Sequence, residues 1–389
     1  MNNINLIFIR SMISGKDNPL LNADKEYFLK SLANNNITVS ETGTPVFFIE
    51  TGGIEEIFIK IYKNYHGPFY LLATDHSNSL PASLEILTFL QENNLEGKII
   101  HGNLDSIVEQ LKSDLIIAKN TKKSHELAVK GILMNKRYGI IGKPSDWLIS
   151  SNVDYNIVKD IFGCELIDIS QDEVTNRMKK YHIFLDKKSE VNLESTLILM
   201  ALREIVNDYL LDGFTIRCFD LLSLVKGTSC WALAKFNEEG IIATCEGDIP
   251  SMLSMAVVKE INKTSSFQAN PSYINIKENE LSIAHCTLPL DMVSSYKITT
   301  HFESGIGNAI KGELKLQKAH IFKLHPNLKE YFHIDCDIVE NLHSNCLCRT
   351  QIRVKTTAEV ASLLDFPFAN HLIVYYDNSE IDLKKVLSK

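Results

Sequence analysis

The sequence of 389 residues predicts an α/β protein in which two α/β domains precede a β-rich C-terminal domain. Short, fully apolar runs alternate with helical patterns up to residue 255, as in the buried parallel strands of Rossmann-like or flavodoxin-like βαβ units. From residue 256 onward, short strands separated by polar turns favour an antiparallel sheet or barrel. Because the chain is too long for one hydrophobic core, we expect domains at 1–133, 134–255 and 256–389.

The elements of the first two domains follow from these patterns. In the first domain we expect strands at 6–9, 46–49, 69–72, 98–100 and 115–118, and helices over 23–33, 54–65 and 124–134. In the second we expect strands at 138–142, 165–169, 214–219 and 240–244, and helices over 155–162, 193–211 and 229–237. Gly213 is a suitable stop for the helix over 193–211.

The third domain is predicted from strands at 281–285, 296–302, 309–316 and 352–355.

No apolar run approaches the roughly 18–20 residues of a membrane-spanning helix, and the N-terminus resembles no secretory signal, so we expect a cytoplasmic protein that does not enter membranes. The net charge of -8 and the dispersed lysines and arginines argue against nucleic-acid binding. Eight scattered cysteines indicate reduced thiols, and a small molecule is the expected partner.

The run Cys245-Glu246-Gly247-Asp248 is the most informative motif. It follows the strand expected at 240–244 and precedes Pro250, which we interpret as a turn. Strand ends that lead into loops commonly carry catalytic groups, and two acids one residue apart project to the same side of an extended chain. The alternative is a solvated acidic turn.

Four short motifs resemble the L-fucose isomerase and L-arabinose isomerase superfamily over most of residues 134–389. The run at 138–147 and Phe162-Gly163-Cys164 look like the start of the family's second domain. Cys245-Glu246-Gly247-Asp248 resembles its loop with a metal-binding glutamate, and Phe368-Ala369-Asn370-His371 resembles its late Ala-Asn-His run. The resemblance implies two α/β domains, a β-rich domain and a metal-dependent aldose–ketose isomerase.

The resemblance implies that Glu246, a metal ligand and acid/base group, shares the metal with His371. The family's second carboxylate is replaced by Asn270 in this chain, and His285 lies near the position of an additional histidine ligand in arabinose isomerase. A divalent ion such as Mn²⁺, held by Glu246, Asn270, His285 and His371, would polarise a sugar carbonyl while a base moves a proton through an enediol. Asparagine can coordinate but cannot act as that base.

Other residues are candidates for the remaining roles. Asp248 and Glu303 are the candidate acids to replace the lost carboxylate. His301 and Glu303 alternate on a predicted strand, where they either bind substrate or form a surface ion pair. Arg349 either binds hydroxyls, a phosphate or a sulfonate, or lies on the surface. Trp147 is either part of a sugar platform or a core residue.

Two further possibilities stay open. A structural zinc site would use His333, Cys336, His343, Cys346 and Cys348, although Cys346 and Cys348 more simply share the inward face of a strand.

The overall function also has alternatives. The chain is either a sugar isomerase or a non-catalytic sugar-binding or regulatory protein. An epimerase or an isomerase of a modified sugar is a third reading. By family resemblance we expect a homo-oligomer, a trimer or hexamer.

Overall fold

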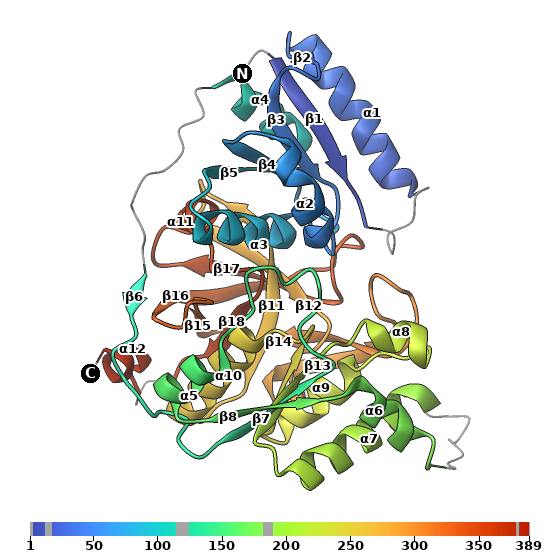
Figure 1. Cartoon of the computed structure of the whole chain (residues 1–389), viewed down its shortest axis with the longest axis vertical. Coiled ribbons are helices and arrows are strands. Elements are labelled where there is room, and N and C mark those ends of the chain that lie inside the picture. Colours follow the sequence, from blue (N-terminus) through green and yellow to red (C-terminus); the bar gives the residue numbers. More distant parts are fainter. Residues whose placement is uncertain (1–2, 12–17, 114–123, 182–189, 379–380, 389) are drawn as a thin grey trace.

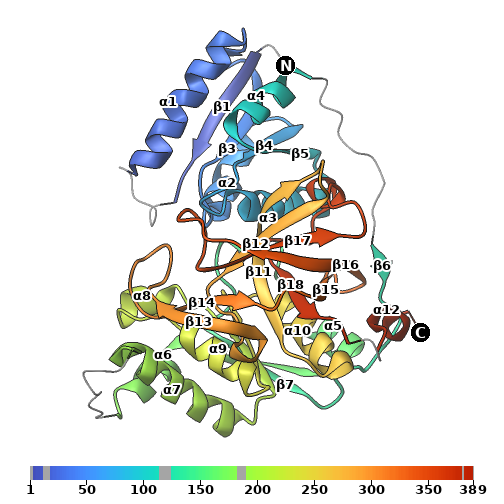
Figure 2. The same ribbon diagram turned by 180° about the vertical axis from the view of Figure 1, so that it is seen from behind.

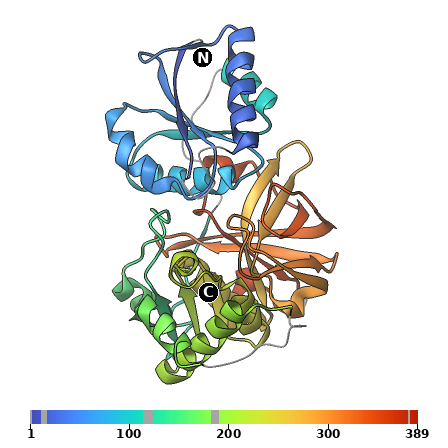
Figure 3. The same cartoon turned by 90° about the vertical axis from the view of Figure 1, so that its right-hand side faces the viewer.

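The computed structural model describes residues 3–11, 18–113, 124–181, 190–378 and 381–388. The described residues form two parallel sheets with helices, a closed antiparallel barrel and a separate hairpin. Figures 1 and 2 show the first sheet at one end of the molecule, and Figure 3 shows the second α/β unit and the barrel side by side beneath it. The predicted mixed α/β class with a β-rich C-terminal part is therefore confirmed, while the division into domains stays a prediction. The strand expected at 115–118 lies outside the described residues.

The first sheet is parallel, with the flavodoxin-like order β2-β1-β3-β4-β5. Its strands are β1 (Asn3–Ile9), β2 (Thr38–Val39), β3 (Thr44–Ile49), β4 (Phe69–Ala73) and β5 (Gly97–His101). The helices are α1 (Pro19–Asn34), α2 (Glu55–Ile61), the 3-10 turn η1 (Tyr62–Asn64), α3 (Ser79–Glu92) and α4 (Leu104–Lys112). Along β3 the side chains alternate: Val46 and Phe48 pack in the cluster with α1 and α4, whereas Phe47 and Ile49 pack in the cluster with α2 and α3. Both faces of the sheet are thereby covered.

The second sheet is also parallel and has the order β10-β9-β7-β8. Its strands are β7 (Arg137–Ile141), β8 (Glu165–Ile169), β9 (Gly213–Ile216) and β10 (Ile242–Cys245). Its helices are α5 (Tyr155–Phe162), α6 (Gln171–Met178), α7 (Leu193–Tyr209), α8 (Asp220–Leu224), α9 (Cys230–Glu238) and α10 (Ile249–Asn262). The helices α6, α7 and α9 pack on one face, and α5 and α10 pack on the other.

The barrel closes in the order β15-β18-β11-β12-β17-β16, because β16 pairs with β15 as well as with β17. Its strands are β11 (Ser266–Asn275), β12 (Glu280–His285), β15 (Lys318–Leu324), β16 (Glu330–Asn341), β17 (Thr350–Thr356) and β18 (Leu372–Tyr376). The remaining elements are the hairpin β13 (Val293–Thr299) and β14 (Ala309–Leu314), η2 (Leu290–Met292), α11 (Ser362–Asp365) and α12 (Leu383–Leu387). One apolar cluster runs from the first sheet through α3 into the barrel, and α10 lies between the second sheet and the barrel.

Several expected elements differ from the structure. The helix predicted over 124–134 is wrong: the chain forms β6 (His125–Glu126), which pairs with β16, and then turns, with Gly131 at a φ of 72°. The helix over 54–65 is divided into α2 and η1. Gly213 does not stop α7, which ends where Leu210 adopts a φ of 52°. Gly213 instead begins β9, where a side chain would lie 2.6 Å from the Cβ atom of Ile242.

Two buried helices were not predicted. α3 is buried along most of its length and so lacks the polar face that marks an amphipathic helix. Pro250 does not make a turn but occupies the first turn of α10, where proline is tolerated. None of the helices in the described residues combines the length and the apolar character needed to cross a bilayer.

Candidate active site

A pocket lies where the carboxyl ends of the strands of both parallel sheets face the barrel. The first unit contributes loops after β1, β3 and β4, the second contributes loops after β7, β9 and β10, and the C-terminal part contributes three polar side chains. The lining residues are Ser11, Gly52, Gly53, Glu55, Asn78, Pro81, Ala82, Trp147, Phe219, Glu246, Asn270, Glu303 and Asn370. The pocket leaves about 460 Å³ between its walls, part of it open to solvent. In open α/β sheets ligands bind at this edge, where the strand order reverses.

Glu246 reaches the pocket because the chain turns sharply after β10. Glu246 and Gly247 have φ values of 68° and 74°. A side chain at Gly247 would lie 2.5 Å from the carbonyl oxygen of Lys143, so only glycine fits this close approach. The indole Nε1–H of Trp147 donates a 2.6 Å hydrogen bond to Glu246 Oε2. The other oxygen, Oε1, is left facing His371, whose Nε2 lies 3.5 Å away.

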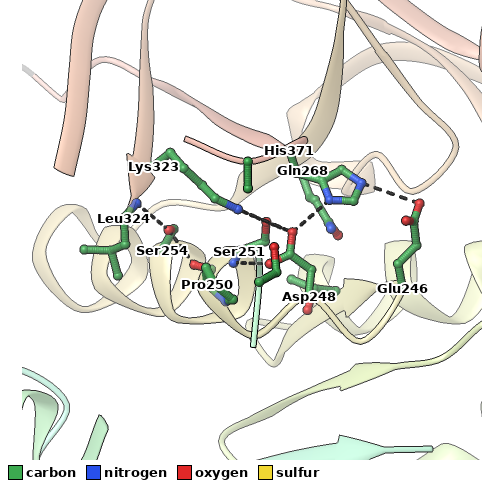
Figure 4. Close-up of polar contacts among 12 residues, drawn as sticks. Glu246, Asp248, Pro250, Ser251, Ser254, Gln268, Lys323, Leu324 and His371 are labelled. Carbon is green, nitrogen blue, oxygen red and sulfur yellow. Dashed lines mark hydrogen bonds and ion pairs between the residues drawn. The ribbon is translucent and has the colours of Figure 1, made fainter. Parts of the chain in front are cut away.

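Asp248 does not line the pocket but lies behind His371 (Figure 4). It is the N-cap of α10: its Oδ1 accepts the backbone N–H of Ser251 at 2.7 Å. Its Oδ2 accepts the hydroxyl of Ser251 at 2.6 Å and contacts His371 Nδ1 at 2.8 Å. Asp248 therefore fixes the orientation of His371 and is a positioning residue.

A lysine completes this buried set. Lys323, on β15, places its Nζ 3.3 Å from Asp248 Oδ2 and donates a 2.6 Å hydrogen bond to Ser251 Oγ. The side chains of Lys323, Asp248 and His371 are all fully buried. Burial alone would raise the pKa of Asp248, but the charges of Lys323 and His371 outweigh it and hold that pKa well below its usual range.

His371 lies between two carboxylates. Burial lowers the pKa of its imidazole, but Glu246 and Asp248 more than offset this and raise the pKa to about 9. The same contact acts in reverse on Glu246, where burial raises the pKa and the charge of His371 outweighs it, so that the net shift is downward. Without a metal ion, a proton on His371 thus balances the two carboxylates.

Two barrel residues add polar atoms beside this pair. Asn270, on β11, has a buried side-chain oxygen without a hydrogen-bond partner among the described residues, although the residue lines the pocket. His285, at the end of β12, holds the hydroxyl of Thr287 with Nδ1 at 2.9 Å. One of its ring atoms lies within 4.8 Å of a Glu246 oxygen, and its ring centre is 5.4 Å from that of His371. The structure therefore brings Glu246, Asn270, His285 and His371 together.

The donor types of these four residues suit a divalent cation, and the ligand atoms that lie within 4.8 Å of one another at this place belong to Cys245, Glu246 and His285. The Asn270 oxygen and His371 Nε2 are both buried and make no hydrogen bond within the described part of the chain. A buried amide oxygen, an imidazole nitrogen and a carboxylate oxygen are donor types that ions such as Mn²⁺ accept. His371 would have to release its proton to coordinate.

Glu303 faces the same pocket, although not from a strand as expected. β13 ends at Thr299, so His301 and Glu303 lie in the turn that follows. The amide of Asn78 donates a 2.8 Å hydrogen bond to Glu303 Oε1. Burial raises the pKa of Glu303 to about 7, and the negative charge of Glu246 adds to the effect while the bond from Asn78 opposes it. A carboxyl group with this pKa can both accept and donate a proton near neutral pH.

The three substrate-binding candidates have different surroundings. Trp147 lines the pocket and holds Glu246. His301 lines the adjoining recess with Glu303 and His285, and burial lowers its pKa to about 4. Arg349 lines neither, because its guanidinium donates to the carbonyl oxygen of Thr300 at 2.7 Å and so braces the turn that carries His301.

Sequence reasoning missed Glu55 and Asn78 in the pocket and Lys323 behind it. Glu55 follows the predicted strand 46–49 through the Gly52-Gly53 pair, and Asn78 follows the predicted strand 69–72. Polar residues just after predicted parallel strands were a usable signal. No comparable signal marked Lys323, because the strand that carries it was not predicted.

The structure does not bring together the five residues of the zinc site that stayed open in the sequence. Cys346 and Cys348 lie in a turn rather than on a strand, and His343 is exposed there. Cys336 packs in the apolar core of the barrel.

We expect Asp248→Asn to lower the pKa of His371 by at least about one unit in chelator-treated protein, because one of its two anionic neighbours loses its charge. NMR titration of the imidazole measures this value. Asp154→Asn is the matched control, since Asp154 also caps a helix but does not contact His371. An unchanged His371 pKa in Asp248→Asn would contradict the positioning role.

Comparison with known proteins gives distant relatives. No protein-family model matches the chain. Over 228 residues it is 22% identical to a sulfoquinovose isomerase from Alkalicoccus urumqiensis. The matched region covers 54% of this chain and 49% of that protein. Over 286 residues it is 20% identical to sulfoquinovose isomerases from Priestia aryabhattai and Priestia megaterium, covering 67% of this chain and 61% of each relative. The chain thus spans about half to three fifths of the length of the curated relatives it matches.

Proposed function

We propose that this chain is a sugar isomerase that interconverts an aldose and a ketose through an enediol. One observation carries the proposal: a set of metal-type ligands, Glu246, Asn270, His285 and His371, adjoins a pocket that also contains Glu303, whose pKa is raised to about 7. The distant relatives named sulfoquinovose isomerase support a sugar isomerase of some kind.

The ligand set would hold a divalent cation such as Mn²⁺, and the cation would supply polarisation of the sugar carbonyl.

 Trp147 orients Glu246, and Asp248 with Lys323 holds His371, so that the ligand atoms keep their places while the substrate exchanges. Glu303 takes the role that Asn270 cannot fill: it removes the proton from one carbon and returns it to the neighbouring carbon.

Glu55 is suited to a second proton-transfer role. It lines the pocket, and its buried Oε2 has no hydrogen-bond partner among the described residues. Burial raises the pKa of Glu55 well above its usual range, and the charges of Glu85 and Glu246 add to this. A protonated Glu55 would donate its proton to the carbonyl oxygen of the sugar and take one back from the neighbouring hydroxyl as the new carbonyl forms.

An epimerase, or an isomerase of a modified sugar, is the second candidate. Asn270 favours it, because this residue replaces the carboxylate of the resembling enzymes and leaves the acid/base work to residues at other positions. The two candidates differ in the carbon from which the proton is removed.

The charged side chains that line the pocket indicate which charge the substrate can carry. Glu55, Glu246 and Glu303 line it, whereas none of the described lining residues is a lysine or arginine. An anionic substituent in this pocket would meet the carboxylate of Glu246 and, above about pH 7, that of Glu303, with no lysine or arginine among the described lining residues. We therefore propose a sugar without a sulfonate or phosphate group, unlike the substrate that the relatives' name states.

We expect Mn²⁺-loaded protein to exchange the C2 proton of a neutral aldose with solvent deuterium, and Glu303→Gln to slow that exchange about 10²–10⁴-fold. The wild-type rate should rise as the pH increases through about 7, where Glu303 loses its proton, and the variant should lose this rise. Glu313→Gln, an exposed acid on β14, is the matched control.

The outcomes separate the alternatives. If proton NMR shows no exchange of any aldose proton with solvent deuterium, with or without Mn²⁺, the chain is a non-catalytic sugar-binding protein and not an isomerase. Exchange at a carbon other than C2 would support the epimerase. Full exchange by Glu303→Gln would remove Glu303 from the mechanism.

We expect a panel of neutral aldoses to contain a substrate whose kcat/KM exceeds that of sulfoquinovose by about 100-fold or more, because the described lining residues offer the sulfonate carboxylates but no lysine or arginine. Sugar turnover measured by coupled assay or NMR checks this. Faster turnover of sulfoquinovose than of every neutral aldose would refute the neutral-substrate proposal but would still support the isomerase activity.

A further inference from the structure

A second cluster of possible ligands lies on the outer face of the barrel, beside α12. His320 is on β15, and His333 and Asp335 are on β16. Their strand neighbours Ile321 and Ile334 pack in the cluster that fills the barrel, so alternation turns the three polar side chains outward. They line a surface cavity of about 1040 Å³, part of it open to solvent, that is separate from the active-site pocket.

Each histidine is anchored through its Nε2 atom. His320 Nε2 contacts Asp377 Oδ1 at 2.9 Å, and His333 Nε2 contacts the hydroxyl of Tyr375 at 2.8 Å. The strand register supports this arrangement, since His320 lies directly across from Asp335 on one side and Tyr375 on the other. Both imidazole rings are thereby fixed by groups outside the cluster.

The two Nδ1 atoms face one carboxylate. Asp335 Oδ1 lies 2.9 Å from His320 Nδ1 and 3.7 Å from His333 Nδ1. The His333 side chain is only 3% exposed, and its Nδ1 makes no hydrogen bond to any described residue. One ligand atom from each of the three residues fits within a mutual distance of 4.8 Å.

The hydrogen-bonding groups around His320 are suited to a cation. A neutral imidazole has one N–H, yet both nitrogens of His320 face a carboxylate oxygen. A second proton or a metal ion on His320 would resolve this conflict, and a metal ion would also engage the buried Nδ1 of His333. Lys384 Nζ, 3.4 Å from Asp335 Oδ2, holds the other carboxylate oxygen and leaves Oδ1 for the cluster.

We propose that His320, His333 and Asp335 form a second metal site that binds a divalent transition metal such as Zn²⁺. Two imidazole nitrogens and one carboxylate oxygen are a three-ligand set typical of Zn²⁺, with water completing the coordination. Asp377 and Tyr375 supply the outer contacts that orient metal-binding histidines. The site shares His333 with the zinc cluster considered from the sequence but replaces its thiolates with His320 and Asp335.

The test is Zn²⁺ titration by calorimetry of the chelator-treated full chain carrying Glu246→Gln, so that the first site is impaired. We expect one Zn²⁺ per chain, bound about 10-fold or more weakly after His333→Ala or Asp335→Asn. Asp335→Asn keeps the shape of a half-exposed side chain and guards against a folding defect in His333→Ala. His343→Ala, which changes an exposed histidine outside the cluster, should bind like its parent.

The proposal is overturned if Zn²⁺ does not bind, if both cluster variants bind as tightly as the parent, or if His343→Ala loses the ion. None of these readouts depends on sugar turnover, so the result is independent of the proposed function. In the otherwise unmodified chain, Asp335→Asn should leave deuterium exchange unchanged, because Asp335 does not line the active-site pocket.

Discussion

The buried carboxylate of Asp248 is the interaction on which the candidate site depends. It caps α10 from the second unit, pairs with Lys323 from the barrel and holds His371 in the loop before β18. Removing one partner from such a buried charge set commonly costs about 3–5 kcal/mol, because the remaining charge has neither water nor a counterion. Asp248 therefore joins three chain segments and determines where His371 Nε2 points. The same interaction that stabilises the contact between the second unit and the barrel also builds the site.

The parallel sheets explain why distant loops meet. In each sheet the strand order reverses beside its first strand, and the loops after the two strands at that point and after the next strand, β4 or β10, open toward the barrel. The first sheet thereby contributes Glu55 and Asn78, and the second contributes Trp147 and Glu246. The barrel closes the opposite wall with Asn270 and Glu303. Glu303, whose pKa is raised by burial, lies at this junction. The buried pair of Lys323 and Asp248 lies there too and supports the candidate metal ligands.

The sequence was informative where periodicity and local chemistry determine the structure. The helix over 155–162 and the strand at 165–169 were predicted to the residue, because an apolar face and a glycine stop are local signals. The family resemblance indicated that Glu246 and His371 belong together, and they lie 3.5 Å apart. The role of Asp248 was not predictable, because it depends on Lys323, which lies far away in the chain. α3 and α10 were missed because helices buried on most sides carry no amphipathic pattern.

We propose that Glu246 and His371, with Asn270 and His285, hold a divalent cation in the orientation that Asp248 and Lys323 impose. Anomalous diffraction from a crystal of the Mn²⁺-loaded protein tests it most directly. The account predicts a manganese peak about 2.0–2.3 Å from Glu246 Oε1 and His371 Nε2, with His371 Nδ1 still on Asp248. A peak elsewhere with this pocket empty, or a His371 ring turned away from Asp248, would contradict it.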